Sequence, residues 1–273
     1  MAPQSIVEVV RPISESTVLV TGATDGLGRA LAGRLHGEGA QLVLHGRDPD
    51  KLDAAAAELP GARTLQADFA SLDDVRRLAG EVDGIDILVN NAGIGSGMPE
   101  GRERAESRDG NELRFQVNYL SGYLLTESLL DRLRAAAPAR VVFVASLGQM
   151  PIDFDDVMLE HNYSGIQAYC QSKLAQIAYG MALAERLDPA EVTVNSLHPS
   201  TFMPTKMVLA ERGSAEDPLE RGVEATHRLV ADPALDGVSG RFFDREEETA
   251  PHPWALDRAN RERLVELSRE LTT

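Results

Sequence analysis

The stretch STVLVTGATDGLG, residues 16–28, decides the fold of this chain. Its first half is a short apolar run with β-branched residues, which predicts a buried strand over residues 16–22. Its second half is a glycine-rich turn that opens an amphipathic helix, predicted over residues 26–38. Glycine lets the backbone approach a pyrophosphate, and the amides at a helix N-terminus favour an anion. The order predicts a dinucleotide-binding unit, with a tight strand–helix turn that binds nothing as the alternative.

The same alternation of strand and helix continues along the chain. Further strands are predicted over residues 41–45, 63–69, 85–90, 140–146, 192–198 and 238–243, and helices over 50–59, 71–81, 111–135, 165–187 and 221–231. Near-continuous apolar strands between helices are typical of a parallel sheet covered on both faces. We therefore expect an α/β protein with a single doubly wound Rossmann-type domain, whose seven-stranded, mostly parallel sheet binds ligands beyond the carboxyl ends of its strands.

The ranges of the predicted strands and helices also define the domain organisation. We expect an N-terminal extension over residues 1–15, a NAD(P)-binding catalytic domain over 16–245 and a C-terminal tail over 246–273. Within the domain, a polar stretch over 95–110 precedes the long helix, and a substrate loop over 199–220 carries short helical turns.

Composition excludes several classes of function. The net charge of −16 argues against a nucleic-acid partner, since phosphate binding needs a basic surface. No apolar run approaches the roughly 20 residues of a membrane span, and charges near the N-terminus argue against a signal peptide. We expect a cytoplasmic location. The single cysteine, Cys170, excludes an internal disulfide framework and a cysteine-based zinc site, and we expect no metal.

Tyr169 and Lys173 are the pair that indicates chemistry. Their spacing of four places both side chains on one face of the helix predicted over residues 165–187. A nearby ammonium lowers the pKa of a phenol from about 10, which suits the phenol to acid–base catalysis. Because the spacing also arises by chance, the pair needs support from elsewhere in the sequence.

That support comes from three further signals in the right order. The glycine turn is followed by Asn90-Asn91-Ala92-Gly93 after the fourth strand, by Asn118 in the long helix and by Ser146 at the end of the fifth strand. Together with Tyr169 and Lys173 they resemble the classical short-chain dehydrogenase/reductase family over about residues 16–245. Taken singly, Ser146 and Asn118 also fit a strand-end serine and a polar residue that breaks a helix locally.

The resemblance implies hydride transfer between a nicotinamide cofactor and a carbonyl or secondary alcohol. It implies that Tyr169 is the general acid/base and that Lys173 lowers the pKa of Tyr169 and contacts the nicotinamide ribose. Ser146 would bind the carbonyl oxygen, and Asn118 would hold a water that relays protons to Lys173. A catalytically idle NADP-binding sensor or interaction protein is the alternative.

The end of the second strand favours NADP(H) over NAD(H). Arg47 follows Gly46, where relatives that use NAD usually carry an acid, and an arginine accommodates the 2′-phosphate of NADP. Three observations keep alternatives open: Asp48 suits NAD, Asp25 stands where NADP-linked relatives often carry a base, and Arg47 could pair with Asp48 or Asp50. The residues expected to bind the cofactor are Gly22, Thr24, Asp25, Gly26, Leu27, Gly28, Arg47, Asp68, Phe69, Asn91, Ala92, Gly93, Tyr169, Lys173, Pro199 and Thr201.

Residues 149–164 lengthen the segment between Ser146 and Tyr169 and resemble an insert of the retinol-dehydrogenase-like branch. That branch often acts on lipophilic aldehydes, ketones or secondary alcohols. The apolar residues of the insert could line a substrate pocket or cover the sheet edge; they are Met150, Ile152, Phe154, Val157, Met158 and Leu159.

Two further expectations concern the loop after the sixth strand and a partner. Ser200 follows Pro199 where the family usually has glycine. Besides a small-molecule substrate, we expect a homodimer through the helices over 111–135 and 165–187. The candidate contacts, which could instead serve the chain's own core, are Leu124, Leu125, Ile177 and Met181.

Overall fold

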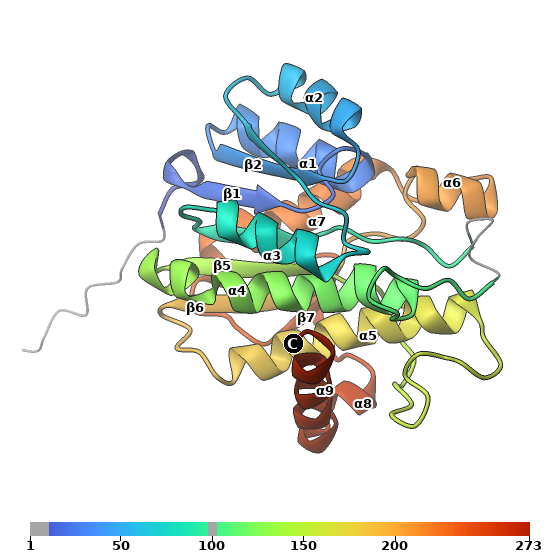
Figure 1. The fold of residues 1–273 in the computed structure, drawn as a ribbon. Helices are drawn as coiled ribbons and strands as arrows, with labels where there is room; N and C mark the ends of the chain where they lie inside the picture. Colours follow the sequence, from blue (N-terminus) through green and yellow to red (C-terminus); the bar gives the residue numbers. More distant parts are fainter. Residues whose placement is uncertain (1–10, 98–102) are drawn as a thin grey trace, which may run out of the picture.

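Helices cover both faces of a twisted sheet in the computed structural model, which describes residues 11–97 and 103–273 (Figure 1). The strands are β1 (Thr17–Val20), β2 (Gln41–Gly46), β3 (Arg63–Gln66), β4 (Ile87–Asn90), β5 (Ala139–Val144), β6 (Val192–His198), β7 (Phe242–Asp244) and β8 (Glu247–Thr249). Their order in space is β3-β2-β1-β4-β5-β6-β7-β8. The switch between β1 and β4 places the ends of these two strands beside a crevice, as the doubly wound fold requires.

The prediction of seven strands was wrong by one strand, β8. It pairs antiparallel with β7, with Phe242 opposite Thr249, whereas the other pairings are parallel. The sequence Glu247-Glu248-Thr249 is exposed and carries no apolar residue, so no periodic pattern marks it. The domain limits of 16–245 and 246–273 remain a prediction, and the sheet continues to Thr249.

Two hydrophobic cores lie on opposite faces of the sheet. Leu19 points into the core beneath α3 (Leu72–Glu81), α4 (Ser121–Ala135) and α5 (Gly165–Ala184). Its neighbours Val18 and Val20 point into the other core, which three helices cover: α1 (Gly26–Gly37), α2 (Pro49–Glu58) and α7 (Leu219–Ala231). Figure 1 shows α3 and α4 in front of the sheet and α7 behind it. Burial on both faces explains why the last three residues of β1, Val18–Val20, are all apolar.

The predicted helix over 111–135 contains a change of helical geometry. A π-helical turn, η3 (Phe115–Leu120), precedes α4 and contains Asn118. A wide turn of this kind is common at functional sites. Two other helices begin at a capping side chain, because Asp48 caps α2 and Ser71 caps α3 by accepting backbone N–H groups.

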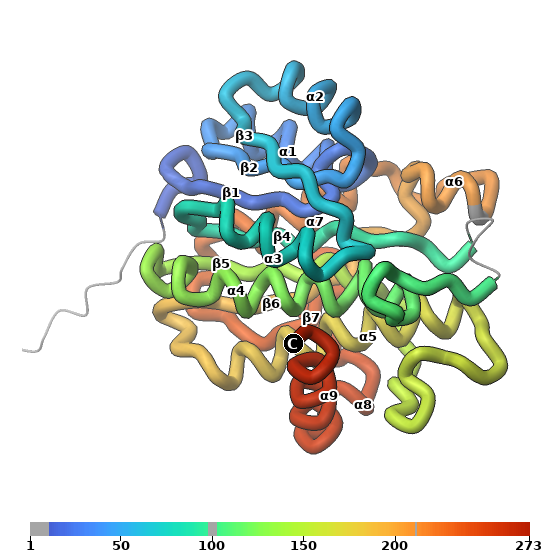
Figure 2. Tube along the Cα trace, viewed as in Figure 1, coloured from blue at the N-terminus to red at the C-terminus, as the bar shows by residue number. Residues whose placement is uncertain are grey.

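The C-terminal segment packs on α5. Its elements are α8 (Pro253–Leu256) and α9 (Arg258–Leu271), and α9 lies across α5 in both ribbon and tube views (Figures 1 and 2). The hydroxyl oxygens of Tyr119 and Ser268 lie 2.6 Å apart and tie α9 to η3. Leu264 of α9 is completely buried.

The four residues considered for a dimer contact serve the chain's own core. Leu125 and Ile177 are buried, and Leu124 and Met181 pack against buried residues. Because α9 also covers α5, part of the surface expected to meet a partner is already occupied by the same chain.

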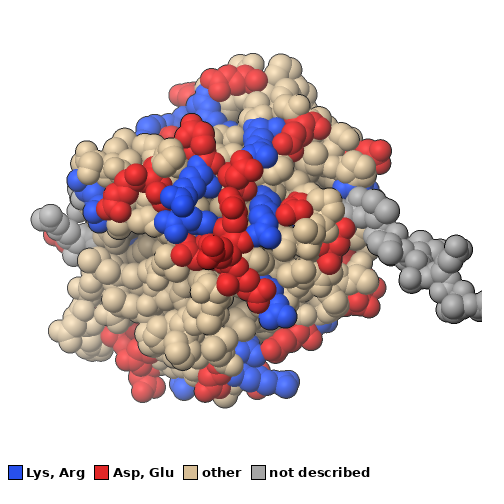
Figure 3. Space-filling model, turned by 180° about the vertical axis from the view of Figure 1, so that it is seen from behind, with Lys and Arg blue, Asp and Glu red and all other residues tan. Residues whose placement is uncertain are grey.

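Short elements complete the described chain: the 3-10 turns η1 (Ile13–Glu15) and η4 (Pro233–Leu235), and α6 (Lys206–Arg212). Residues 1–10 of the expected N-terminal extension lie outside the described residues. Within the described ranges, none of the helices combines the length and the apolar character needed to cross a bilayer. On the face opposite that of Figure 1, acidic and basic side chains lie next to one another (Figure 3).

Candidate active site

The glycine turn between β1 and α1 is closely packed. Gly22 has a φ of +66°, and a Cβ at this position would come within 2.9 Å of the Ala92 Cα. A Cβ on Gly28 would lie 2.3 Å from the carbonyl oxygen of Gly22. Both positions therefore require glycine, which brings the start of α1 close to the end of β1.

Asn91 holds this turn against the end of β4. Its side-chain amide donates to the carbonyl oxygens of Thr21 (2.8 Å) and Gly22 (3.2 Å). The hydroxyl oxygen of Thr21 accepts the backbone N–H groups of Asn91 and Ala92. The Asn91 side chain thus shapes the turn.

His45 supports the turn from the other side and was missed by the sequence analysis. Its Nδ1 accepts the Gly22 N–H at 3.2 Å, so its Nε2 carries the proton donated to the Ala67 carbonyl oxygen at 3.0 Å. The ring stacks on Phe69 with centroids 4.2 Å apart. Burial lowers the pKa of His45 to about 4, which keeps it in this neutral form. A lone histidine in an apolar strand carries no signal that would identify this role.

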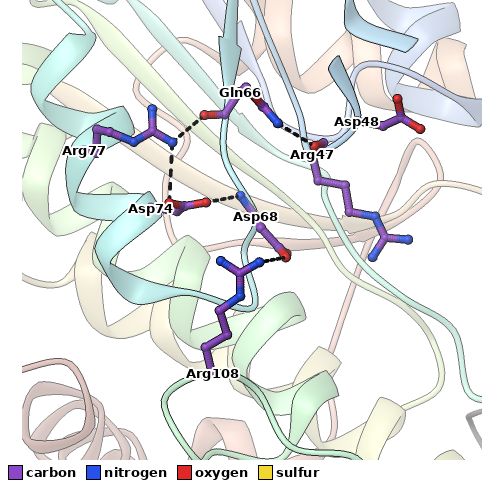
Figure 4. A pocket seen from close by; sticks show the side chains of 7 residues that line it. All are labelled: Arg47, Asp48, Gln66, Asp68, Asp74, Arg77 and Arg108. Carbon is purple, nitrogen blue, oxygen red and sulfur yellow. Dashed lines mark hydrogen bonds and ion pairs between the residues drawn. The ribbon is translucent and has the colours of Figure 1, made fainter. Parts of the chain in front are cut away.

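A polar hollow of about 570 Å³ lies beyond the ends of β2 and β3 (Figure 4). It is lined by Arg47, Asp48, Gln66, Asp68, Asp74, Arg77 and Arg108. Arg77 is paired with Asp74 and Glu81. Asp48 accepts the backbone N–H groups of Asp50 and Lys51.

Arg47 differs from the other two arginines of the hollow. It is exposed and has no ion pair with a described residue, so the alternative of a pair with Asp48 or Asp50 is not realised. Arg108 donates to Asp68 at 3.3 Å. Arg108 was not among the predicted site residues, because its polar segment, residues 95–110, has no periodicity.

Ser146 and Tyr169 meet around Gly148. The Ser146 Oγ accepts the Gly148 N–H at 3.0 Å. A Cβ on Gly148 would lie 3.4 Å from that Oγ and 3.9 Å from Cε1 of Tyr169. The end of β5 and the first half of α5 therefore bring the two hydroxyl-bearing side chains to one place.

Lys173 lies behind this pair. Its Nζ is 5.7 Å from the centre of the Tyr169 ring and donates to the Val144 carbonyl oxygen at 2.8 Å and to Oε1 of Gln176 at 3.1 Å. Burial lowers the pKa of Lys173 to about 8. An ammonium in this position favours the ionised form of a neighbouring phenol.

Asn118 connects η3 with the segment after β4. Its Oδ1 accepts the Ile94 N–H at 2.8 Å, and its Nδ2 donates to the Ile94 carbonyl and to Oγ of Ser172. A Cβ on Gly93 would lie 3.2 Å from the Asn118 Oδ1 and 3.6 Å from the Lys173 Nζ. The four candidate catalytic residues and the Asn91–Gly93 segment thus share one site.

The comparisons with known proteins agree with this arrangement. The short chain dehydrogenase family profile matches residues 16–215. The chain belongs to the short-chain dehydrogenase family. Human retinol dehydrogenase 13 is 35% identical over 280 residues, which cover 92% of this chain and 83% of the relative. Human retinol dehydrogenase 14 is 33% identical over 290 residues, with coverages of 92% and 84%.

A solved structure of an uncharacterised protein from Mycobacterium paratuberculosis has a TM-score of 0.80 at 29% identity, and the match covers 96% of this chain and 94% of that one. The similarity to the two retinol dehydrogenases places this short-chain dehydrogenase in the retinol-dehydrogenase-like branch, which residues 149–164 had indicated. It is an NAD(P)-binding oxidoreductase that acts on the CH–OH or carbonyl group of a small molecule.

The loop after β6 closes over the glycine turn of this short-chain dehydrogenase. The Lys206 Nζ lies 2.6 Å from Oδ2 of Asp25, and Thr205 lies over Gly26, where a Cβ would come within 3.1 Å of its methyl group. Thr205 also caps α6 by accepting the Val208 N–H. The predicted substrate loop therefore borders the expected cofactor site.

Asp217 fixes the start of the same loop. Its carboxylate accepts the Ser200 hydroxyl at 2.7 Å, the Thr201 N–H at 3.0 Å and an Arg245 N–H at 3.2 Å. These hydrogen bonds, that from Ser200 foremost, hold the pKa of Asp217 well below its usual range. Ser200, the departure from the family's glycine, thus anchors the loop. The Thr201 hydroxyl lies 3.1 Å from both His198 and Arg245.

The insert over residues 149–164 contributes mainly to the core. Ile152 and Val157 belong to the buried cluster, and Phe154 and Met158 pack against it. Leu159 is buried, whereas Met150 is exposed. The structure thus favours the covering role over a pocket for the insert residues other than Met150.

Proposed function

We propose that this short-chain dehydrogenase is an NADP-dependent oxidoreductase of lipophilic ketones, aldehydes or secondary alcohols, with Tyr169 as general acid/base. The observation that carries the proposal is the approach of Ser146 and Tyr169 to Gly148, with the buried Lys173 behind them. A site with a phenol, an ammonium and a serine hydroxyl suits proton transfer to a carbonyl oxygen.

The residues at the carboxyl ends of β1, β2 and β4 fit a dinucleotide. The turn from Gly22 to Gly28 would hold the pyrophosphate, and the backbone of Asn91–Gly93 would lie beside the nicotinamide ribose, next to Lys173. Asp68 and Phe69 would contact the adenine end, and Pro199 and Thr201 the nicotinamide end. When bound, the cofactor supplies or accepts the hydride.

Two features support NADP over NAD. The Arg47 guanidinium is exposed at the polar hollow and has no ion-pair partner among the described residues, so it can bind a 2′-phosphate without losing another contact. At Gly46, a Cβ would come within 2.4 Å of the Thr24 methyl group. An acid for the 2′-hydroxyl of NAD therefore has no room at Gly46 unless Thr24 moves.

The polar side chains of the site have separate tasks. Tyr169 would donate its phenolic proton to the oxygen of the reduced carbonyl, or remove the proton in the reverse direction. The charge of Lys173 would favour the ionised form of that phenol. The Ser146 Oγ already accepts the Gly148 N–H, so its own hydrogen can be donated to the substrate oxygen. Asn118 fixes Ile94 and Ser172 around Lys173, and its water-holding role remains a prediction.

Apolar side chains support a lipophilic substrate. Leu147 and Met150 follow Ser146, Ile166 lies in the first turn of the helix that carries Tyr169, and Phe202 and Leu209 belong to the substrate loop. All five are large hydrophobic residues with exposed side chains. Their segments all leave the carboxyl edge of the sheet, so we propose that they provide an apolar entrance to the site.

The test measures NADPH and NADH oxidation with a panel of long-chain and aromatic aldehydes and ketones. Tyr169→Phe should reduce kcat by about 10²–10⁴-fold and leave NADPH binding intact, because only proton transfer is lost. Arg47→Ala should weaken NADPH binding by about tenfold or more and leave NADH binding unchanged. Arg77→Ala is the matched control, because Arg77 lines the same hollow but is already paired.

Three outcomes would refute parts of the proposal. Full turnover by Tyr169→Phe would show that Tyr169 is not the general acid/base. Equal weakening of NADPH and NADH binding by Arg47→Ala would show that Arg47 does not select NADP. Tight NADPH binding with no turnover over the whole panel would favour the idle, NADP-binding alternative.

A homodimer is also proposed, with a contact surface away from the part of α5 that α9 covers.

A further inference from the structure

The side-chain amide of Gln149 joins the loop of Ser146 to the C-terminal segment. Its Nε2 donates to the backbone carbonyl of Ser146 at 3.0 Å, and its Oε1 accepts the backbone N–H of His252 at 2.6 Å. The first partner is an acceptor and the second a donor. Only one orientation of the amide satisfies both, so the contact is directional.

The C-terminal segment also holds the helix that carries Tyr169 and Lys173. His252 caps α8 by accepting the Trp254 N–H at its Nδ1, and α8 and α9 both pack on α5. Trp254 stacks near Phe154 of the insert, with ring centroids 5.6 Å apart. Residues 252–271 thus contact α5 directly and reach Ser146 through Gln149.

We infer that Gln149 is a positioning residue, through which the C-terminal segment sets the location of Ser146 relative to Tyr169. This inference rests on the proposed function, since it gives Ser146 a role in binding the substrate oxygen. Ser146 lies two residues past the end of β5, just beyond the hydrogen bond from the Ala145 N–H to the Leu197 carbonyl oxygen of β6. The Gln149 amide supplies such a bond to its carbonyl, and the N–H of His252 fixes the amide in turn.

The experiment removes the His252 N–H without changing the backbone shape. His252 has a φ of −52°, which lies within the range of proline, so His252→Pro deletes the donor and retains the conformation. His252→Ala is the matched control, because it loses the same side chain and cap but keeps the N–H. Gln149→Leu removes both hydrogen bonds of the amide at similar volume.

We expect His252→Pro to lower kcat by about tenfold relative to His252→Ala, and Gln149→Leu to lower it at least as much relative to wild type. The KM for NADPH should stay the same in all of them, because neither Gln149 nor His252 is among the residues expected to bind the cofactor. A purely structural role would change stability and cofactor binding together. Equal kcat values for His252→Pro and His252→Ala, with a normal kcat for Gln149→Leu, would overturn the inference.

A second measurement tests the positioning role of Gln149 independently of the proposed function. Hydrogen exchange of the backbone amides over residues 146–150 should be faster in His252→Pro than in His252→Ala, whether or not a substrate has been found. Unchanged exchange would overturn the inference. Failure of the proposed function would instead appear as no turnover in wild type, or as full activity of Tyr169→Phe.

Discussion

The Nζ of Lys206 lies 2.6 Å from Oδ2 of Asp25, so an ion pair joins the substrate loop to the glycine turn. The other oxygen of Asp25 accepts the Gly26 N–H at the start of α1. Asp25 stands where NADP-linked relatives often carry a base, and here Lys206 brings a positive charge to that place from a distant part of the sequence. The negative charge of Asp25 is thereby offset beside the expected pyrophosphate site.

Loss of this charge should weaken cofactor binding. Lys206→Met leaves Asp25 uncompensated, and we expect NADPH to bind about two- to fivefold more weakly at low salt. The effect should shrink as salt is raised, because the lysine side chain is 74% exposed. Binding titrations at two ionic strengths check this. The double variant Asp25→Asn/Lys206→Met should recover most of the affinity, and a salt-independent loss would contradict the ion-pair explanation.

Introducing the acid typical of NAD-linked relatives should destabilise the protein. Gly46→Asp places a Cβ 2.4 Å from the Thr24 methyl and 3.2 Å from Cγ of Leu52, and we expect a loss of about 1–3 kcal/mol in the free energy of unfolding. Thr24→Ser removes the methyl, so Gly46→Asp should cost less in that background. Urea denaturation of the four proteins measures both costs. Equal costs in the two backgrounds would show that Thr24 is not the obstacle.

The buried ammonium of Lys173 should make stability depend on pH. Burial lowers its pKa to about 8 in the folded protein, whereas the unfolded chain keeps the ordinary pKa of about 10.4. Between these values the unfolded state binds more protons, so this residue makes stability rise with pH over that window. Lys173→Met removes the contribution. The difference in unfolding free energy, wild type minus variant, should therefore rise from pH 7.5 to pH 10, and a flat difference would contradict the pKa shift.

Docking of α9 should contribute to stability through Leu264. Its side chain is completely buried, so Leu264→Ala should cost about 2–5 kcal/mol. Leu256 of α8 is 50% exposed, and Leu256→Ala should change stability by less than about 0.5 kcal/mol. Thermal and urea unfolding of this matched pair provide the measurement. Similar, small losses for both variants would mean that α9 is not docked as described.

The sequence allowed the sheet and the position of the site to be predicted because strands, glycine turn and helix starts leave local patterns. Ser146 and Asn91 could be placed at the site because Ser146 ends a predicted strand and Asn91 follows one, and Tyr169 and Lys173 because of helical spacing. The strand β8 could not be predicted, since Glu247-Glu248-Thr249 has neither apolar residues nor alternation.

The contacts that hold the site residues in place also leave no local pattern in the sequence. His45, Arg108 and Lys206 act on Gly22, Asp68 and Asp25, which lie far away in the chain. Such pairings depend on how segments meet in space. For the same reason the sequence left open whether the insert residues Ile152 and Val157 line a pocket or cover the sheet edge.

The docking of α9 on α5 has a consequence during biosynthesis. Residues 165–184 leave the ribosome well before residues 258–271. A nascent chain that has already assembled strands β1 through β6 therefore still exposes the face of α5 that α9 will cover. Transiently exposed apolar surface of this kind favours aggregation and is recognised by chaperones. The helix that bears Tyr169 and Lys173 is therefore among the last parts of the fold to be completed, and activity should appear only after Leu264 has reached its place.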